Sequence, residues 1–241
     1  MKVLGIIPSR FGSKRFPGKP LIDLKGKTMI ERVYMGAKKS KMLDHLIVAT
    51  DDMRIYNEVK RFGGEVVMTS KNHDSGTERC AEVIEKYNDY DLVINIQGDE
   101  PMINHVQIDQ LIGLFLDKSI ELGTLAIPFK NKHEVMDANR VKVVMDKNNC
   151  AIYFSRSIIP YAESESFQLK NYIKHIGIYA YRRSFLESLK DLKNSFLENS
   201  ESLEQLKWIY NGFKIHVCMT NIQTPNIDTP EDIKAVIDLL E

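Results

Sequence analysis

Short apolar segments alternate with amphipathic segments through the first half of this chain. The apolar segments have the length of strands, and they lie at 3–7, 45–50, 65–68, 92–96 and 124–128. Segments of helical periodicity follow them, at 28–39, 52–62, 76–87 and 104–116. This alternation predicts a mostly parallel sheet with helices on both faces. Ligands of such sheets bind beyond the carboxyl ends of the strands.

The second half is less regular. Strand-like segments are found at 141–145, 151–154, 175–181 and 214–219, and helical ones at 203–210 and 230–240. No segment is rich enough in Pro, Gly or Ser to act as a linker between domains. We therefore expect one α/β domain over residues 1–241.

Composition excludes several classes of protein. The 241 residues contain 33 Lys+Arg and 33 Asp+Glu, which argues against nucleic-acid binding through net positive charge. Three cysteines without a CxxC pair favour a reducing, cytoplasmic location over a disulfide framework or a zinc site. Neither a signal peptide nor an apolar run of about 20 residues is found, so we expect no membrane partner.

The loop after the first strand reads IIPSRFGSKRFPGKPL, residues 6–21. Three prolines and two glycines prevent regular structure, while Arg10, Lys14, Arg15 and Lys19 supply positive charge. Exposed backbone amides and cations together bind phosphate oxygens. The loop fits neither a Walker A motif nor the dinucleotide fingerprint, because five residues separate the glycines and Pro20 follows Lys19. A solvated turn is the simpler alternative.

Two carboxylates are candidate metal ligands. Asp99 follows a buried strand in QGDEP, and Asp228 precedes the last helix in PNIDTP. Mg²⁺ usually takes one or two protein carboxylates together with substrate phosphates. Asp228 is equally well explained as a helix cap, and Asp99 as a turn residue.

The segment HDSGTER, residues 73–79, has two interpretations as well. Ser75 and Glu78 form a capping-box pattern at a helix start. Ser75, Gly76 and Thr77 also offer hydroxyls and a close backbone approach, which suit recognition of a polar base. Arg79 would lie one turn into the helix, where it could reach an anion.

Seven motifs in the same order resemble those of one enzyme family. They are IIPSRFGSKRFPGKPL, HDSGTER, INIQGDEP, YFSRSIIP, KHIGIYAYR, LEQLKW and NIDTPED, and they run from Ile6 to Asp232. This set is similar to that of the CMP-KDO synthetases, or 3-deoxy-manno-octulosonate cytidylyltransferases. The resemblance implies a Rossmann-like nucleotidyltransferase fold and a reaction in which CTP and KDO, an eight-carbon acid sugar of bacterial lipopolysaccharide, give CMP-KDO and pyrophosphate. It also implies Mg²⁺, a homodimer, and a dimerisation and sugar-binding insertion at about 151–217.

The resemblance assigns roles to individual residues. Lys19, Arg10 and Asp99 would be catalytic, and Asp99 and Asp228 would hold the metal. The residues assigned to CTP are Arg10, Ser13, Arg15, Lys19, Ser75 and Gly76. Those assigned to the sugar are Arg79, Gln97, Arg156, His175, Tyr179, Glu204 and Gln205.

The sugar side is open to a structural alternative. His175, Gly177, Tyr179 and Tyr181 alternate along one face of a predicted strand, and such aromatic residues can simply pack an interface. Three other functions also compete with KDO activation: transfer to 8-amino-KDO, transfer to a sialate-type nonulosonate, and nucleotide binding without catalysis. The two aspartates beside Lys19 count against the last of these.

Overall fold

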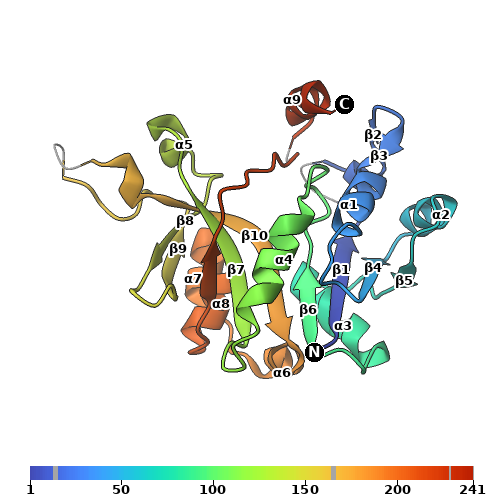
Figure 1. Ribbon diagram of the computed structural model, residues 1–241, viewed down its shortest axis with the longest axis horizontal. Helices are drawn as coiled ribbons and strands as arrows, with labels where there is room; N and C mark the ends of the chain where they lie inside the picture. Colours follow the sequence, from blue (N-terminus) through green and yellow to red (C-terminus); the bar gives the residue numbers. More distant parts are fainter. Residues whose placement is uncertain (13–15, 164–166, 228, 241) are drawn as a thin grey trace.

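The computed structural model describes residues 1–12, 16–163, 167–227 and 229–240. Its main sheet has the order β11-β7-β10-β6-β1-β4-β5, with β8 and β9 attached beside β10 (Figure 1). The strands on the N-terminal side are β1 (Val3–Ser9), β4 (His45–Thr50), β5 (Val66–Met68) and β6 (Leu92–Asn95). The others are β7 (Leu122–Pro128), β8 (Lys142–Met145), β9 (Ala151–Ser155), β10 (Ile173–Arg182) and β11 (His216–Met219).

Most strands of this sheet are parallel. β1 pairs in parallel with both β4 and β6, and β4 with β5. β10 runs antiparallel to β6 and β7, whereas β11 is parallel to β7. The predicted mostly parallel sheet is therefore confirmed, and β10 carries the residues of KHIGIYAYR into its centre.

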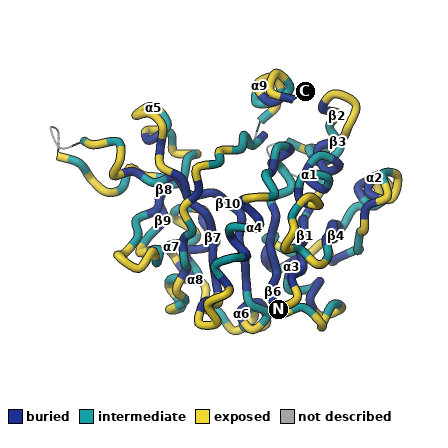
Figure 2. Tube along the Cα trace, viewed as in Figure 1, coloured by how far each residue is buried: buried dark blue, intermediate teal, exposed yellow. Residues whose placement is uncertain are grey.

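Helices cover both faces of the sheet, as expected. One face packs against α1 (Met29–Ala37), α2 (Met53–Arg61) and α4 (His105–Leu114), and in Figure 1 α4 lies in front of the strands. The other face packs against α3 (Gly76–Lys86), α6 (Arg183–Ser188) and α8 (Gln205–Tyr210). Figure 2 shows the central strands buried between these two layers.

The helix starts follow the capping residues of the sequence. Thr28, Asp52, Ser75 and Asn104 each accept a hydrogen bond from a backbone N–H of the first turn. Such caps satisfy donors that the helix itself leaves unpaired, which explains why these starts were predictable.

Several short elements were not predicted. They are β2 (Asp23–Leu24), β3 (Lys27–Thr28), α5 (Lys132–Met136), α6, α7 (Phe196–Glu201) and the 3₁₀ turns at 19–21, 169–171 and 189–191. The predicted insertion range, 151–217, contains β9, β10 and all of α6, α7 and α8, so it includes the central strand β10 of the main sheet. Its role in dimerisation stays a prediction.

The C-terminal segment returns to the N-terminal half. The last helix, α9 (Asp232–Leu239), lies beside the N-terminal half (Figure 1). Its residue Val236 packs with Leu24 and Met29, as do Ile227 before the helix and Leu240 after it. This small cluster places the end of the chain near the loop that follows β1. Within the described ranges, no helix has the length and apolar character needed to cross a membrane.

Candidate functional site

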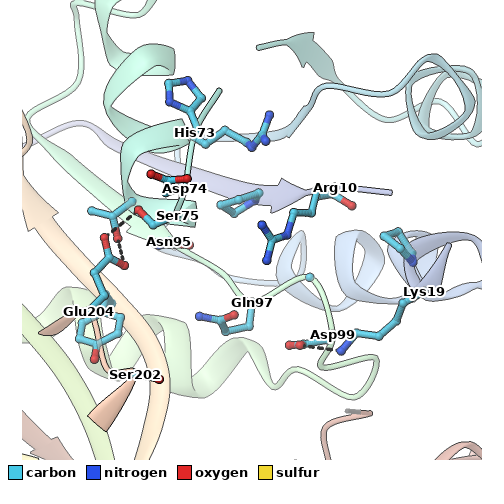
Figure 3. Close-up of a pocket in the computed structure, with 18 residues that line it drawn as sticks. Arg10, Lys19, His73, Asp74, Ser75, Asn95, Gln97, Asp99, Ser202 and Glu204 are labelled. Carbon is cyan, nitrogen blue, oxygen red and sulfur yellow. Dashed lines mark hydrogen bonds and ion pairs between the residues drawn. The ribbon is translucent and has the colours of Figure 1, made fainter. Parts of the chain in front are cut away.

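A hollow of about 500 Å³ opens where β1 and β6 end and α3 begins. Figure 3 shows its walls, which bring together residues far apart in the sequence. Arg10 and Lys19 line one side, His73 to Thr77 another, and Gln97 to Asp99 the floor. Tyr179, Ser202 and Glu204 come from the second half of the chain. The hollow thus lies at the carboxyl edge of the parallel strands, where the fold predicts a ligand.

Lys19 and Asp99 meet in this hollow. Lys19 begins the 3₁₀ turn, after Gly18 in a left-handed conformation (φ 73°) that suits glycine. Its Nζ lies 2.8 Å from Asp99 Oδ2 and also donates to the carbonyl oxygen of Ile227. An ammonium group has three donors, and described residues accept from it at these two positions. As far as the described residues go, the third N–H is left for another acceptor, such as a phosphate oxygen.

Arg10 adds a second cation to the same side. It directly follows β1, and Figure 3 shows its side chain pointing into the hollow above Gln97. Together with Lys19 it gives this wall the positive charge that a polyphosphate requires. Ser13, Arg15 and Asp228, three further predicted site residues, lie outside the described residues.

Asp99, which was predicted to be a metal ligand, lies at the floor of the hollow. Its carboxylate is partly exposed, at 28%, and lines the hollow beside Lys19. The carbonyl oxygen of Asp99 accepts a hydrogen bond from the backbone N–H of Ile227 at 3.0 Å, which ties the residue before Asp228 to this site. Among the described residues no group of three or more His, Cys, Asp or Glu side chains could hold a metal. A Mg²⁺ ion here would therefore rely on few carboxylates, as Mg²⁺ bound to phosphates commonly does.

A chain of buried hydrogen bonds forms the opposite wall. Asn95 Nδ2 donates to the hydroxyl of Tyr181 at 3.3 Å, and that hydroxyl lies 3.2 Å from Thr77 Oγ1. Thr77 Oγ1 donates to Glu204 Oε2 at 2.9 Å, and Ser75 Oγ to Glu204 Oε1 at 2.7 Å (Figure 3). Both oxygens of one carboxylate are thus held by hydroxyls from the start of α3.

The pKa of Glu204 is raised to about 7, chiefly by burial. The hydroxyls of Ser75 and Thr77 oppose this rise, and the carboxylates of Glu198 and Glu78 add to it. When ionised, a carboxylate accepts a hydrogen bond from a sugar hydroxyl, and when protonated it can also donate one. With a pKa near neutrality, both forms are populated around pH 7.

His175 and Tyr179 lie close together on β10. Their ring centroids are 5.3 Å apart, and the Tyr179 ring also packs edge-on against Trp208. Burial lowers the pKa of His175 to about 3, so its imidazole is neutral, and its Nε2 lies 3.0 Å from Thr124 Oγ1. The hydroxyl of Tyr179, a residue that is only 6% exposed, has no hydrogen-bond partner in the described chain. Since buried hydroxyls are normally paired, this group is suited to a ligand.

The two arginines predicted near the sugar are engaged by the protein. Arg79 is buried and donates to Thr69, to the Ser70 carbonyl and to Asp51, at 3.0 Å for the last. Arg156 donates to the carbonyl oxygens of Glu201, Ala138 and Ser202, at 2.7, 3.3 and 3.3 Å. Their contacts with a sugar stay a prediction.

The remaining predicted residues are placed as follows. Gln97 lines the hollow and donates to the Gly177 carbonyl at 2.7 Å. Gly76 packs near Pro8 and Asn95, and Gln205 is buried at the start of α8.

Sequence reasoning assigned no role in the site to Asn95. It also singled out Thr77 and Tyr181 without assigning either to the Glu204 carboxylate. Thr77 lies within HDSGTER, and Asn95, the last residue of β6, lies within INIQGDEP. The alternation of side chains along β6 indicates to which face of the sheet Asn95 points. The sequence does not indicate that Tyr181, on a strand far along the chain, is its hydrogen-bond partner.

Comparisons with known proteins agree with this architecture. Residues 4–215 match the model of a family described as cytidylyltransferase. A protein of Fusobacterium nucleatum named 3-deoxy-manno-octulosonate cytidylyltransferase is 52% identical over 242 residues, which covers 100% of this chain and 98% of the relative. A protein of the same name from Parabacteroides distasonis is 49% identical, with the same coverage. A solved CMP:2-keto-3-deoxy-manno-octonic acid synthetase complexed with CTP is 40% identical with a TM-score of 0.93, covering 99% of this chain and 98% of that one.

Proposed function

The chain belongs to the cytidylyltransferase family, and on this premise we propose that it transfers a cytidylyl group from CTP to KDO, 3-deoxy-D-manno-oct-2-ulosonate. The observation that carries the proposal is the full-length identity of 52% with a relative named for this activity. The products are CMP-KDO, which bacteria use for lipopolysaccharide, and pyrophosphate.

The geometry of the hollow supports this reaction. The anomeric hydroxyl of the sugar attacks the α-phosphorus of CTP, a new P–O bond forms, and the bond to pyrophosphate breaks. Negative charge grows on the phosphoryl oxygens and on the leaving group, so fixed cations next to them lower the barrier. Lys19, anchored by Asp99 and the Ile227 carbonyl, can offer a positioned donor without reorganisation during the reaction.

We assign the two walls of the hollow to the two substrates. The triphosphate lies along Arg10 and Lys19, and the base lies near Ser75 and Gly76 at the start of α3. The hydroxyl-bearing tail of the sugar faces Glu204 and the unpaired hydroxyl of Tyr179.

Mg²⁺ is the cofactor that we propose. Asp99 and Asp228 would hold it, with the substrate phosphates as further ligands. When bound, it would neutralise phosphate charge and help to align the sugar hydroxyl with the α-phosphorus.

We further propose a cytoplasmic homodimer. The three cysteine thiols are free, which suits a reducing compartment. Large apolar side chains are exposed on and after β9, namely Ile152, Ile158 and Tyr161, the last at 87%. These exposed apolar side chains lie within ten residues of one another in the sequence, and a contiguous patch of such residues would suit a protein–protein interface.

The function is tested by incubating the purified protein with CTP, KDO and Mg²⁺ while pyrophosphate release is followed. Parallel reactions contain ATP or UTP as the nucleotide, and 8-amino-KDO or a sialate as the acid sugar. We expect turnover with CTP and KDO above all other pairs. Background pyrophosphate with KDO, together with turnover of another acid sugar, would refute the substrate assignment.

A further inference from the structure

The aromatic ring of Phe11 contacts two segments that lie apart from it in the sequence. Phe11 directly follows Arg10 and packs against the hydrophobic core on the side of α1 and α2. The guanidinium carbon of Arg54, in α2, lies 3.3 Å from the centroid of the Phe11 ring. Gly18 lies at the end of the ring, where a Cβ atom on residue 18 would come within 3.2 Å of Phe11 Cζ. The ring is therefore held at its face by Arg54 and at its end by Gly18.

The guanidinium of Arg54 is itself held at two points by Asp52. Its Nε donates to Asp52 Oδ1 at 2.9 Å, and its Nη2 donates to Asp52 Oδ2 at 2.7 Å. Asp52 is the N-cap of α2, because its Oδ1 also accepts from the backbone N–H of Arg54. A planar group that is bonded at two points presents a fixed face to its neighbour. We call Phe11, Gly18, Asp52 and Arg54 the Phe11 clamp.

A second arginine of α2 shows what an ordinary ion pair on this helix looks like. Arg54 and Arg61 have side chains that are 59% and 58% exposed, and each is paired with carboxylates. Arg61 donates to Glu58 and Glu31. Exposed pairs of this kind contribute little to stability, because solvent screens the charges. Arg54 differs in that it also stacks on a ring from another segment, which adds an attraction that an ion pair lacks.

The clamp closes the loop that carries the two cations of the hollow. The backbone N–H of Gly18 donates to the carbonyl oxygen of Phe11 at 2.9 Å, so residues 11 and 18 are joined across the loop. Arg10 comes directly before this joined pair, and Lys19 directly after it. Both cations line the hollow. The position of Phe11 therefore determines where both cationic side chains begin.

We propose that the Phe11 clamp is a positioning device, in which Asp52 and Arg54 hold Phe11 so that the loop presents Arg10 and Lys19 to the triphosphate. This rests on the proposed function. Phe11 and Arg54 lie outside the set of residues that lines the hollow, so they act through the two cations. Charge stabilisation in a transition state depends on donors that are already in place, and a small displacement of such donors lowers the rate. Loss of the clamp leaves the loop in displaced conformations for part of the time.

A double-mutant cycle tests this proposal. Arg54→Met removes the charged plane, and Phe11→Leu removes the ring while it keeps an apolar contact with the core. In the wild-type background, Arg54→Met should lower kcat/KM for CTP on the order of 2- to 5-fold, the range for one exposed cation–π contact. In the Phe11→Leu background the same substitution should have no further effect, because both side chains act through one contact. Asp52→Asn, which keeps the helix cap, should give a smaller loss than Arg54→Met.

Cleavage by trypsin gives a readout that does not need activity. Residues 10–18 contain three basic residues after which trypsin can cut. The rate of cutting in a folded protein follows the population in which a segment is open. Arg54→Met and Phe11→Leu should therefore be cut in this segment about 2- to 5-fold faster than the wild type. Arg61→Met is the matched control, and it should keep the wild-type rate of cutting and the wild-type kcat/KM.

Two results would overturn the proposal. The first is an equal effect of Arg54→Met on kcat/KM with and without the Phe11 ring, since this would make Arg54 a charge that attracts CTP from a distance. The second is wild-type kinetics and wild-type cutting of Arg54→Met, which would leave the stack as a surface contact without consequence for the loop. If the wild type itself fails to turn over CTP and KDO, the proposed function fails, and the trypsin comparison still decides whether the clamp holds the loop.

Discussion

Replacing Glu204 with glutamine is expected to change how the stability of the protein depends on pH. Burial raises the pKa of this carboxyl group from 4.5 to about 7 in the folded protein. Glutamine has the same size and keeps one acceptor and one donor for the hydroxyls of Ser75 and Thr77. The substitution therefore removes the titration while it keeps most of the packing.

The sign and the magnitude follow from the two pKa values. Between pH 4.5 and pH 7 the folded protein holds a proton that the unfolded chain has released, so the free energy of unfolding falls as pH rises through this window. The window spans about 2.5 pH units, and at about 1.4 kcal/mol per unit the total loss is about 3 kcal/mol. Below pH 4.5 and above pH 7 this group contributes no further slope.

Urea unfolding of wild type and Glu204→Gln between pH 4.5 and pH 8 measures the effect. All other titrating groups are common to both proteins, so the difference between the two free energies isolates Glu204. We expect the variant to gain about 3 kcal/mol relative to the wild type across the series. A flat difference for Glu204→Gln would show that this carboxyl group titrates normally and would refute the reasoning.

Three further predictions concern the proposed chemistry and assembly. Lys19→Ala should lower kcat about 10²–10³-fold with little change in the KM for CTP, because its charge acts mainly on the transition state; a rise in KM alone would restrict Lys19 to ground-state binding. Asp99→Asn and Asp228→Asn should each abolish turnover in a folded protein, and raised Mg²⁺ or Mn²⁺ should partly rescue it; near-normal activity of Asp228→Asn at low Mg²⁺ would leave Asp228 as a helix cap. Tyr161→Glu should shift the mass measured by light scattering from dimer to monomer, and a wild type that is already monomeric would contradict the dimer.

The repeating half of the fold was predictable from the sequence because its signals are local. His45–Thr50 was predicted with the bounds that the structure has, and the helices begin at their capping side chains. Caps and apolar periodicity act within a few residues, so they are present in any short window of the sequence. The short helices at 132–136 and 196–201 carry only one or two turns, and tertiary packing rather than periodicity decides them.

The sequence predicted many of the residues that line the candidate site, but it did not predict their hydrogen-bond partners. The sequence placed Lys19 and Asp99 at strand ends, and the parallel sheet brings such ends together. The same reasoning left Arg79 and Arg156 as free cations, since nothing local indicates that Asp51 and the carbonyl oxygens at 138, 201 and 202 accept from them. Buried partners of a long side chain depend on which segments the fold packs around it.

The antiparallel strand β10 explains why the sugar side was the harder half to predict. A continued parallel order would place β7 beside β6, but β10 is inserted between them and pairs with both. Tyr179 lies opposite Asn95 in this register, and the irregularity between Ile176 and Tyr179 keeps His175 and Tyr179 within ring contact. The antiparallel strand β10 thus carries Tyr179 into the hollow that Asp99 lines, and no local signal in the sequence indicates this insertion between β6 and β7.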